Sequence, residues 1–231
     1  MADMVNRLAR LFFGLSLYGF TMAMMVESTL GLDPWDVFHE GLAQHLPLTF
    51  GQVVILVGAI VLLLWIPLRQ MPGIGTVFNV IVIGLAADAG IAAINQPDNL
   101  WLRGLLLGGG VVGNGLAGAI YIGAQLGPGP RDGLWLGLVR RTGRSVRLWR
   151  TVIEVSVLAV GFLLGGTVGV GTVLYALTIG PIVQFFLPHM QARTSDGASR
   201  PHWSGTIRKR GVLRTDGCVM TGPEVGSGEA E

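Results

Sequence analysis

The sequence contains few charged residues and almost no cysteine. Charged residues make up 13% of its 231 residues, whereas soluble domains usually carry about 25%. The single cysteine, Cys218, excludes an internal disulfide and a metal site built from cysteines. Because hydrophobic residues make up 51% of the chain, the composition predicts an integral membrane protein that lies in the lipid bilayer.

Common enzyme and cofactor motifs are missing as well. The sequence has no His-Glu-x-x-His, no Gly-x-Ser-x-Gly and no Gly-Lys followed by Ser or Thr. These motifs mark zinc proteases, serine hydrolases and nucleotide-binding loops. His39 and His45 lie on different faces of a helix, and the histidines show no metal-ligand spacing. The sequence therefore predicts no enzyme activity, no cofactor and no metal.

The sequence does contain an internal repeat. Residues 7–84 match residues 103–180 without a gap, at a shift of 96 positions. The identities fall on residues that set the backbone shape more than on interchangeable apolar residues, so they indicate a duplicated structural unit. The matched pairs include Gly14 and Gly110, Gly31 and Gly127, Pro34 and Pro130, Asp36 and Asp132, and Thr76 and Thr172.

Six stretches have the length and apolarity of a membrane-spanning helix, about 20 residues. Backbone polar groups must be paired inside lipid, so all six are expected to be α-helices. The first stretch has an internal copy at 103–127, which argues against a cleaved secretion signal. The stretches are 11–30, 48–68, 74–94, 105–126, 149–164 and 170–187.

Arginines and lysine are concentrated on one side of these spans, the side that faces the cytoplasm in membrane proteins. The loop that carries Asp33, Asp36 and Glu40 has no lysine or arginine, while the opposite loops carry most arginines, Arg131 among them. This bias predicts a membrane protein with both termini in the cytoplasm. Each copy has three spans, an odd number, so the second copy should cross the membrane in the opposite sense.

The expected fold is therefore all-α, a polytopic bundle of six transmembrane helices in two inverted-topology three-helix repeats. The transmembrane domain covers residues 1–188, with repeats at 7–94 and 103–188. Residues 189–231 are polar and predict a disordered cytoplasmic tail. Its basic run at 208–210 suits an anionic membrane surface and is too short to indicate nucleic-acid binding.

Two short segments begin at Pro34 and Pro130. Proline in a first turn and aspartate nearby are signals for a helix start. Each segment is too short to span, so it should lie at the membrane interface or dip partly inward. Asp36 and Asp132 have two interpretations, as helix caps or as polar residues at an entrance on each face.

A Gly-x-Gly-Thr motif precedes the third and the sixth span. Glycines beside a helix start allow close helix packing, and exposed amides there attract anions. Packing is the favoured interpretation of each single glycine. The candidate anion-binding residues are Gly73, Gly75, Thr76, Gly169, Gly171 and Thr172.

Polar residues inside the predicted spans are candidates for function, because ionisable groups in a membrane are costly. Glu154 follows Arg150 by four positions, and this pair has no counterpart in the first copy. The pair is either part of an asymmetric binding site or a structural ion pair. The amide side chains of Asn79, Asn114 and Gln184 either form hydrogen bonds between helices or line a pathway. The candidate pathway or binding residues are Asp36, Asn79, Asp88, Asn114, Arg131, Asp132, Arg150, Glu154 and Gln184.

Several of these motifs resemble the YczE-type bacterial membrane proteins, which are grouped with YitT and YyaS relatives. The resemblance covers about residues 7–187 and implies a polytopic inner-membrane protein, without a ligand residue to carry over. The motifs are Leu30-Gly31-x-x-Pro34-Trp35-Asp36, Gly73-x-Gly75-Thr76-x-x-Asn79, Gly127-x-Gly129-Pro130-Arg131-Asp132, Arg150-Thr151-x-x-Glu154 and Gly165-Gly166-x-x-Gly169-x-Gly171-Thr172.

The inverted repeat predicts a small transporter, permease or exporter of unknown substrate, since many secondary transporters share this architecture. Two or more molecules of the protein are expected to associate as a homo-oligomer, because six short spans enclose a thin core. Two other classes stay open. One is a non-transporting membrane scaffold or accessory protein that supports an enzyme complex; the other is a membrane-embedded enzyme, for which no nucleophile–base pair is found.

Overall fold

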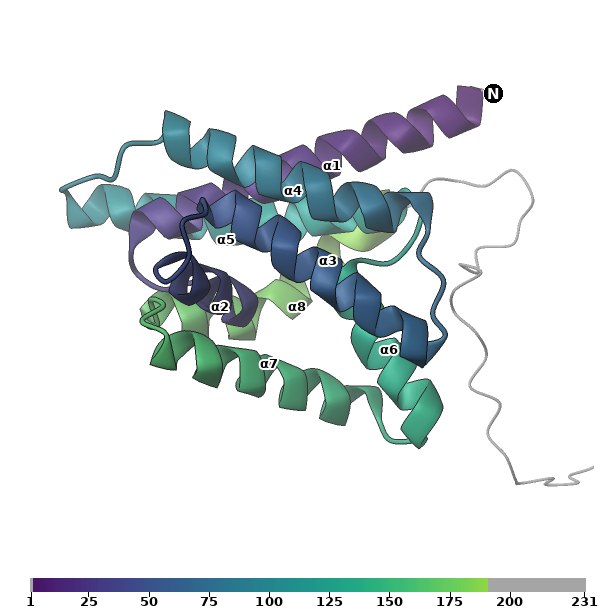
Figure 1. Cartoon of the computed structure of the whole chain (residues 1–231). Helices are drawn as coiled ribbons and strands as arrows, with labels where there is room; N and C mark the ends of the chain where they lie inside the picture. The colour runs from purple at the N-terminus through teal and green to yellow at the C-terminus, as the bar shows by residue number, and fades with distance from the viewer. Residues whose placement is uncertain (1, 191–231) are drawn as a thin grey trace, which may run out of the picture. The chain divides into compact units, whose positions relative to one another are not determined.

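The computed structural model describes residues 2–190, which form eight α-helices (Figure 1). A shift of 96 positions places each helix of the first copy on one of the second. The all-α class is therefore confirmed, and the duplication holds at the level of helices. The helices are α1 (Ala2–Ser28), α2 (Pro34–Ala43), α3 (Phe50–Leu68), α4 (Ile74–Ala93), α5 (Leu100–Gly123), α6 (Pro130–Thr142), α7 (Val146–Leu163) and α8 (Val170–Met190).

Among the described residues, five helices are long and apolar enough to cross a membrane: α1, α3, α4, α5 and α8. The remaining expected span, 149–164, falls in α7, which is 18 residues long and carries Arg150 and Glu154. Helix α8 ends at Met190, two residues beyond the predicted end of the transmembrane domain. The predicted tail from residue 191 onward, with Cys218, lies outside the described residues.

The two short helices begin where the prolines predict. Pro34 and Pro130 occupy the first turns of α2 and α6, where a missing N–H costs nothing. The cap of α2 is Asp33, whose carboxylate accepts a hydrogen bond from the Asp36 N–H at 2.8 Å. The capping interpretation of Asp36 is thus wrong. Asp132 accepts from the backbone of Gly129 and does take part in the start of α6.

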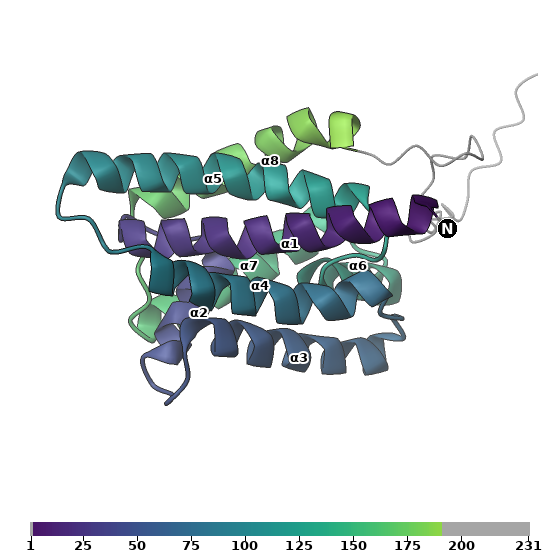
Figure 2. The ribbon, with the colours of Figure 1, turned by 90° about the horizontal axis from the view of Figure 1, so that it is seen from above.

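Helices α1 and α5 pack closely in opposite directions. Gly14, at the middle of α1, faces Tyr121, late in α5, with only 2.8 Å from an added Cβ to the Tyr121 nitrogen. Gly110, nearer the start of α5, faces Met25, near the end of α1. Small residues permit this approach. Helix α4 packs along α1 and α8 along α5, and Figure 2 shows α5, α1, α4 and α3 side by side in that order.

The copies also exchange backbone contacts at the Gly-x-Gly-Thr motifs. The Gly75 N–H donates to the Leu126 carbonyl at 3.0 Å, and the Gly171 N–H donates to the Leu30 carbonyl at 2.8 Å. These two bonds are equivalent under the repeat, because each residue of one lies 96 positions from its counterpart in the other. Each copy therefore completes a turn of the other.

The N–H groups of the first glycine and of the threonine in each motif are paired inside the protein too. The Thr76 hydroxyl accepts from the Gly73 N–H at 3.2 Å and donates to the Pro128 carbonyl at 2.8 Å. The Thr172 hydroxyl accepts from the Gly169 N–H at 3.3 Å. This pairing favours the packing interpretation of both motifs over an anion site.

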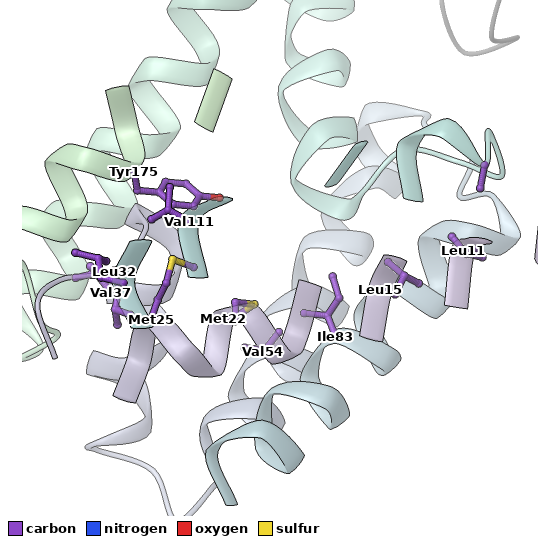
Figure 3. Packing of buried hydrophobic residues seen from close by; sticks show 12 residues of the cluster. Leu11, Leu15, Met22, Met25, Leu32, Val37, Val54, Ile83, Val111 and Tyr175 are labelled. Atoms are coloured by element: carbon purple, nitrogen blue, oxygen red, sulfur yellow. The ribbon is translucent and has the colours of Figure 1, made fainter. Parts of the chain in front are cut away.

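One hydrophobic cluster joins the two copies. Figure 3 shows Met22 and Met25 of α1 with Val111 of α5 and Tyr175 of α8. A second cluster lies between α2 and α3 and includes Trp35 and Trp65. The copies thus share a core, and separating them would expose it to the surroundings.

The packing of the two copies differs at one place. Helix α3 packs along α4, where Gly51 faces Gly84 and Gly58 faces Val80. The counterparts α7 and α8 have no comparable packing in the described structure. The α3–α4 pair is therefore closed, and the equivalent α7–α8 pair is open.

We expect Gly31→Ala to lower the thermal unfolding midpoint of the purified protein more than Gly143→Ala does. Both glycines have positive φ, +119° and +70°, where an L side chain costs about 1–2 kcal/mol. An added Cβ at Gly31 lies 2.7 Å from the Gly169 nitrogen, whereas Gly143 has open space. Overpacking adds about 1–3 kcal/mol. Equal losses in the two variants would contradict the exchanged contact.

Candidate functional site

A cavity of about 330 Å³ lies between the two copies, and all eight described helices contribute to its lining. Valines and isoleucines of α3, α4, α5, α7 and α8 form the apolar part of its lining, with Val54, Val57 and Val61 of α3 among them. The lining also contains aromatic, polar and charged side chains, which is the usual character of a small-molecule site. The aromatic side chains are Tyr18, Trp35, Tyr121, Trp135 and Tyr175.

The centre of the charged wall is Arg131, on the first turn of α6. Its guanidinium lies 3.3 Å from Asp33 Oδ2 and 3.4 Å from Asp36 Oδ1. It also lies over the Trp35 ring, 5.1 Å from the centroid. A planar guanidinium can bind two carboxylates and an aromatic face together. Arg131 therefore joins α6 of the second copy to the start of α2 in the first.

The local folds of α2 and α6 produce this meeting. Asp33 caps α2 and Asp36 lies in its first turn, where the helix dipole favours carboxylates. The Trp65 indole N–H donates to the Pro130 carbonyl at 3.1 Å and fixes the start of α6 against α3. The charge bias predicted that the loops with Arg131 and with these aspartates lie on opposite membrane faces, and the structure brings the three side chains into contact.

Burial controls the protonation of this cluster. It raises the pKa of Asp36 to about 6, although Arg131 opposes the shift. It likewise raises the pKa of Asp33. Burial lowers the pKa of His39 to about 3, so the neutral ring donates from Nδ1 to Asp36 Oδ1 at 3.1 Å. Asp36 is fully buried, so it is no entrance residue, and its Oδ2 has no hydrogen-bond partner in the described structure.

The two predicted asparagines, Asn114 and Asn79, line the same cavity but differ in burial and in hydrogen bonding. Asn114 is fully buried; its Oδ1 accepts from the Tyr175 hydroxyl at 2.9 Å, and its Nδ2 donates to Thr21 at 3.3 Å. It therefore joins α1, α5 and α8. Asn79 is 9% exposed and faces the cavity from α4.

The predicted ion pair of α7, Arg150 with Glu154, lies at the outer part of the cavity. Arg150 Nε donates to Glu154 Oε1 at 2.9 Å, and their side chains are 53% and 39% exposed. Gln184 of α8 lines the same part, and Asp132 faces it from α6. The cavity thus reaches the surface where α7 and α8 do not pack together.

Asp88 lies apart from the cavity. Its carboxylate accepts from the Thr49 hydroxyl and from the Gly51 N–H, the latter at 2.7 Å, so it binds the start of α3 to α4. The sequence predictions missed Asp33, His39 and the cavity aromatics. The repeat contains a signal for two of them, since Tyr18 and Tyr175 stand at the positions equivalent to Asn114 and Asn79.

Comparison with known proteins places the chain in a family. Residues 5–188 match the family of unknown function DUF6198. An uncharacterized protein of Haemophilus influenzae is 40% identical over 177 residues, which cover 77% of this chain and 81% of that protein. The uncharacterized membrane protein YczE of Bacillus subtilis is 34% identical over 188 residues, 80% of this chain and 87% of YczE. YyaS of the same organism is 25% identical over 76% of this chain and 89% of YyaS.

No solved structure matches the chain. The fold and the comparisons together define a multi-pass, all-helical membrane protein. The chain belongs to the DUF6198 family, and its resemblance to the YczE-type proteins is confirmed.

We expect Arg131→Leu to destabilise the protein by about 3–5 kcal/mol, because Asp33 and Asp36 would stay buried without their cation. The loss should shrink as the pH falls. The pKa of Asp36 is raised from 3.8 to about 6, so the folded protein binds this proton more tightly than the unfolded chain does. Removing Arg131, which lowers this pKa, raises it further, so the variant takes up the proton at a higher pH than the wild-type protein. The variant therefore recovers part of its lost stability as the pH falls towards 6.

The measurement is thermal unfolding in detergent at several pH values. Arg150→Leu is the matched control, because its partner Glu154 is 39% exposed and such pairs contribute at most about 1 kcal/mol. Equal losses in the two variants, or a loss for Arg131→Leu that does not change with pH, would count against the buried cluster.

Proposed function

We propose that this protein is a small membrane carrier that moves a small molecule through the cavity between its two copies. In this proposal the chain has six spans in two inverted three-helix repeats, both termini lie in the cytoplasm, and the protein resides in the bacterial cell membrane. It acts by transport and not as an enzyme. The cavity would open alternately to the two sides of the membrane.

The directions of the helices support the inverted arrangement. Helices α1 and α5 are equivalent under the repeat and run in opposite directions, as the contacts of Gly14 and Gly110 require. Helix α7 serves as the sixth span. Its charged residues Arg150 and Glu154 face the cavity, which is how a membrane helix accommodates ionisable groups.

The observation that carries the proposal is the unequal packing of equivalent helices. Helix α3 packs along α4, while α7 and α8 do not pack together. The two copies share one backbone plan, although α7 carries Arg147 and Glu154 where α3 carries Gly51 and Gly58. Exchanging their conformations would bring α7 towards α8 and separate α3 from α4. Carriers with inverted repeats use such an exchange to move access from one side to the other.

Paired cysteines test this exchange in a Cys218→Ser background. A Cβ added at Gly58 lies 3.5 Å from the Val80 Cβ, within disulfide range. Gly58→Cys with Val80→Cys is expected to crosslink rapidly. The equivalent pair, Glu154→Cys with Ala176→Cys, is expected to crosslink more slowly, through the exchanged conformation. Counting free thiols with a maleimide of high mass measures both rates.

The matched control combines both pairs in one chain. Once the first pair has formed its disulfide, α3 and α4 cannot separate, and crosslinking of the second pair should stop. A fixed scaffold would crosslink the first pair alone. Crosslinking of the second pair at an unchanged rate in the locked protein would also contradict the carrier.

Reporter fusions test the inverted topology separately. We expect a fusion after Leu46 to be active as alkaline phosphatase, outside the cytoplasm, and a fusion after Arg144 to fluoresce as a green fluorescent protein, inside it. The reason is that an odd number of spans per copy reverses the second copy. Localisation of both sites in one compartment would remove the topology on which the carrier depends.

A further inference from the structure

The cavity holds more carboxylates than cations. Three carboxylates and two guanidiniums line it, and His39 is neutral because burial lowers its pKa. Asp36 lies directly behind Arg131, so full ionisation of all four carboxylates would leave an excess of two negative charges, which a bound cation would relieve. The lining groups are Arg131 and Arg150 on one side and Asp33, Asp132 and Glu154 on the other.

Both guanidiniums are already engaged by protein carboxylates. Arg131 contacts Asp33 and Asp36, and Arg150 binds Glu154 at 2.9 Å. An anionic ligand would have to displace one of these partners. Asp132 differs, since no cation of the described structure lies within ion-pair distance of it. It accepts hydrogen bonds from Gly129 and Trp135; burial raises its pKa, while the charges of Arg150 and Arg131, which lie nearby without pairing to it, lower the pKa.

The aromatic side chains of the cavity suit an organic cation. Tyrosine and tryptophan rings attract cations at their faces, and groups of such rings bind quaternary ammonium ions. One ring already does so here, because the Arg131 guanidinium lies over Trp35. Trp135 and Tyr121 both lie near Asp132 and offer further faces to a second cation.

A metal ion fits the cavity less well. The described residues contain no group of three or more His, Cys, Asp or Glu side chains arranged to hold one. The volume of about 330 Å³ is at the lower end of small-molecule pockets, which measure about 300–1,000 Å³. The ligand should therefore be small, organic and positively charged.

We propose that the cavity binds a small organic cation, a quaternary or protonated amine, with Asp132 as its counter-charge and the cavity aromatics around it. This inference names the substrate class of the carrier and rests on that proposed function. The cation enters at the outer part of the cavity, past Arg150, Glu154 and Gln184.

Binding to the purified full-length protein tests the charge preference. Benzyltrimethylammonium is the probe, and phenylacetate of similar size and opposite charge is the comparison. Isothermal titration and thermal shift should both report binding of the cation and none of the anion at the same concentration. Binding of phenylacetate in preference, or of neither compound, would overturn the proposal.

Three variants locate the site. Asp132→Asn should weaken binding of benzyltrimethylammonium by about tenfold or more, the effect of losing one partly buried charge contact. Asp132→Glu keeps the charge and should restore most of the affinity, which separates charge from folding. Asp98→Asn makes the same change at an exposed loop residue and should bind normally. Unchanged affinity in Asp132→Asn would place the cation elsewhere and refute the assignment.

The binding and crosslinking experiments fail independently. Cation binding needs no exchange of conformations, so it would persist in a fixed scaffold that crosslinks its first cysteine pair alone. Crosslinking of both pairs without cation binding would keep the carrier and remove the substrate class.

Discussion

Two equivalent backbone hydrogen bonds hold this fold together, from Gly75 to Leu126 and from Gly171 to Leu30. Each joins a helix start in one copy to a turn in the other, and the turns depend on the positive φ of Gly31 and Gly127. The turns direct the chain into α2 and α6. Because both short helices are set by the opposite copy, the charged cluster at their starts exists only when the copies are assembled. The cavity is thus a property of the pair of repeats.

The duplication has kept the backbone and changed the side chains around the cavity. Glycine, proline and threonine remain at equivalent positions in the turns and helix starts. At the cavity, Trp35 of the first copy is replaced by Arg131 at the equivalent position of the second copy, and Gly58 is replaced by Glu154. Backbone positions tolerate little change because a Cβ would meet a neighbouring backbone, while cavity positions face open space. The scaffold is therefore symmetric and its chemistry is not.

The sequence predicted the parts of the fold that depend on backbone geometry. Pro34 and Pro130 mark the short helices, and the repeated glycines mark the close contacts, since few other residues permit either. The site was predicted in part: Asn79, Asn114, Arg131, Asp132, Arg150, Glu154 and Gln184 line the cavity, whereas Asp36 lies behind Arg131. The contact of Arg131 with Asp33 and Asp36, and the binding of Asp88 to the start of α3, depend on tertiary packing. The distribution of charges along the sequence does not reveal that packing.

The exchanged turns have a consequence for biosynthesis. The Leu30 carbonyl of the first copy has its partner in Gly171, and the Gly75 amide has its partner in Leu126. When the ribosome has completed α4, neither partner has yet been made. The first half of the chain must wait in the translocation machinery with these groups unsatisfied, so the final architecture forms late, when the nascent polypeptide reaches α8.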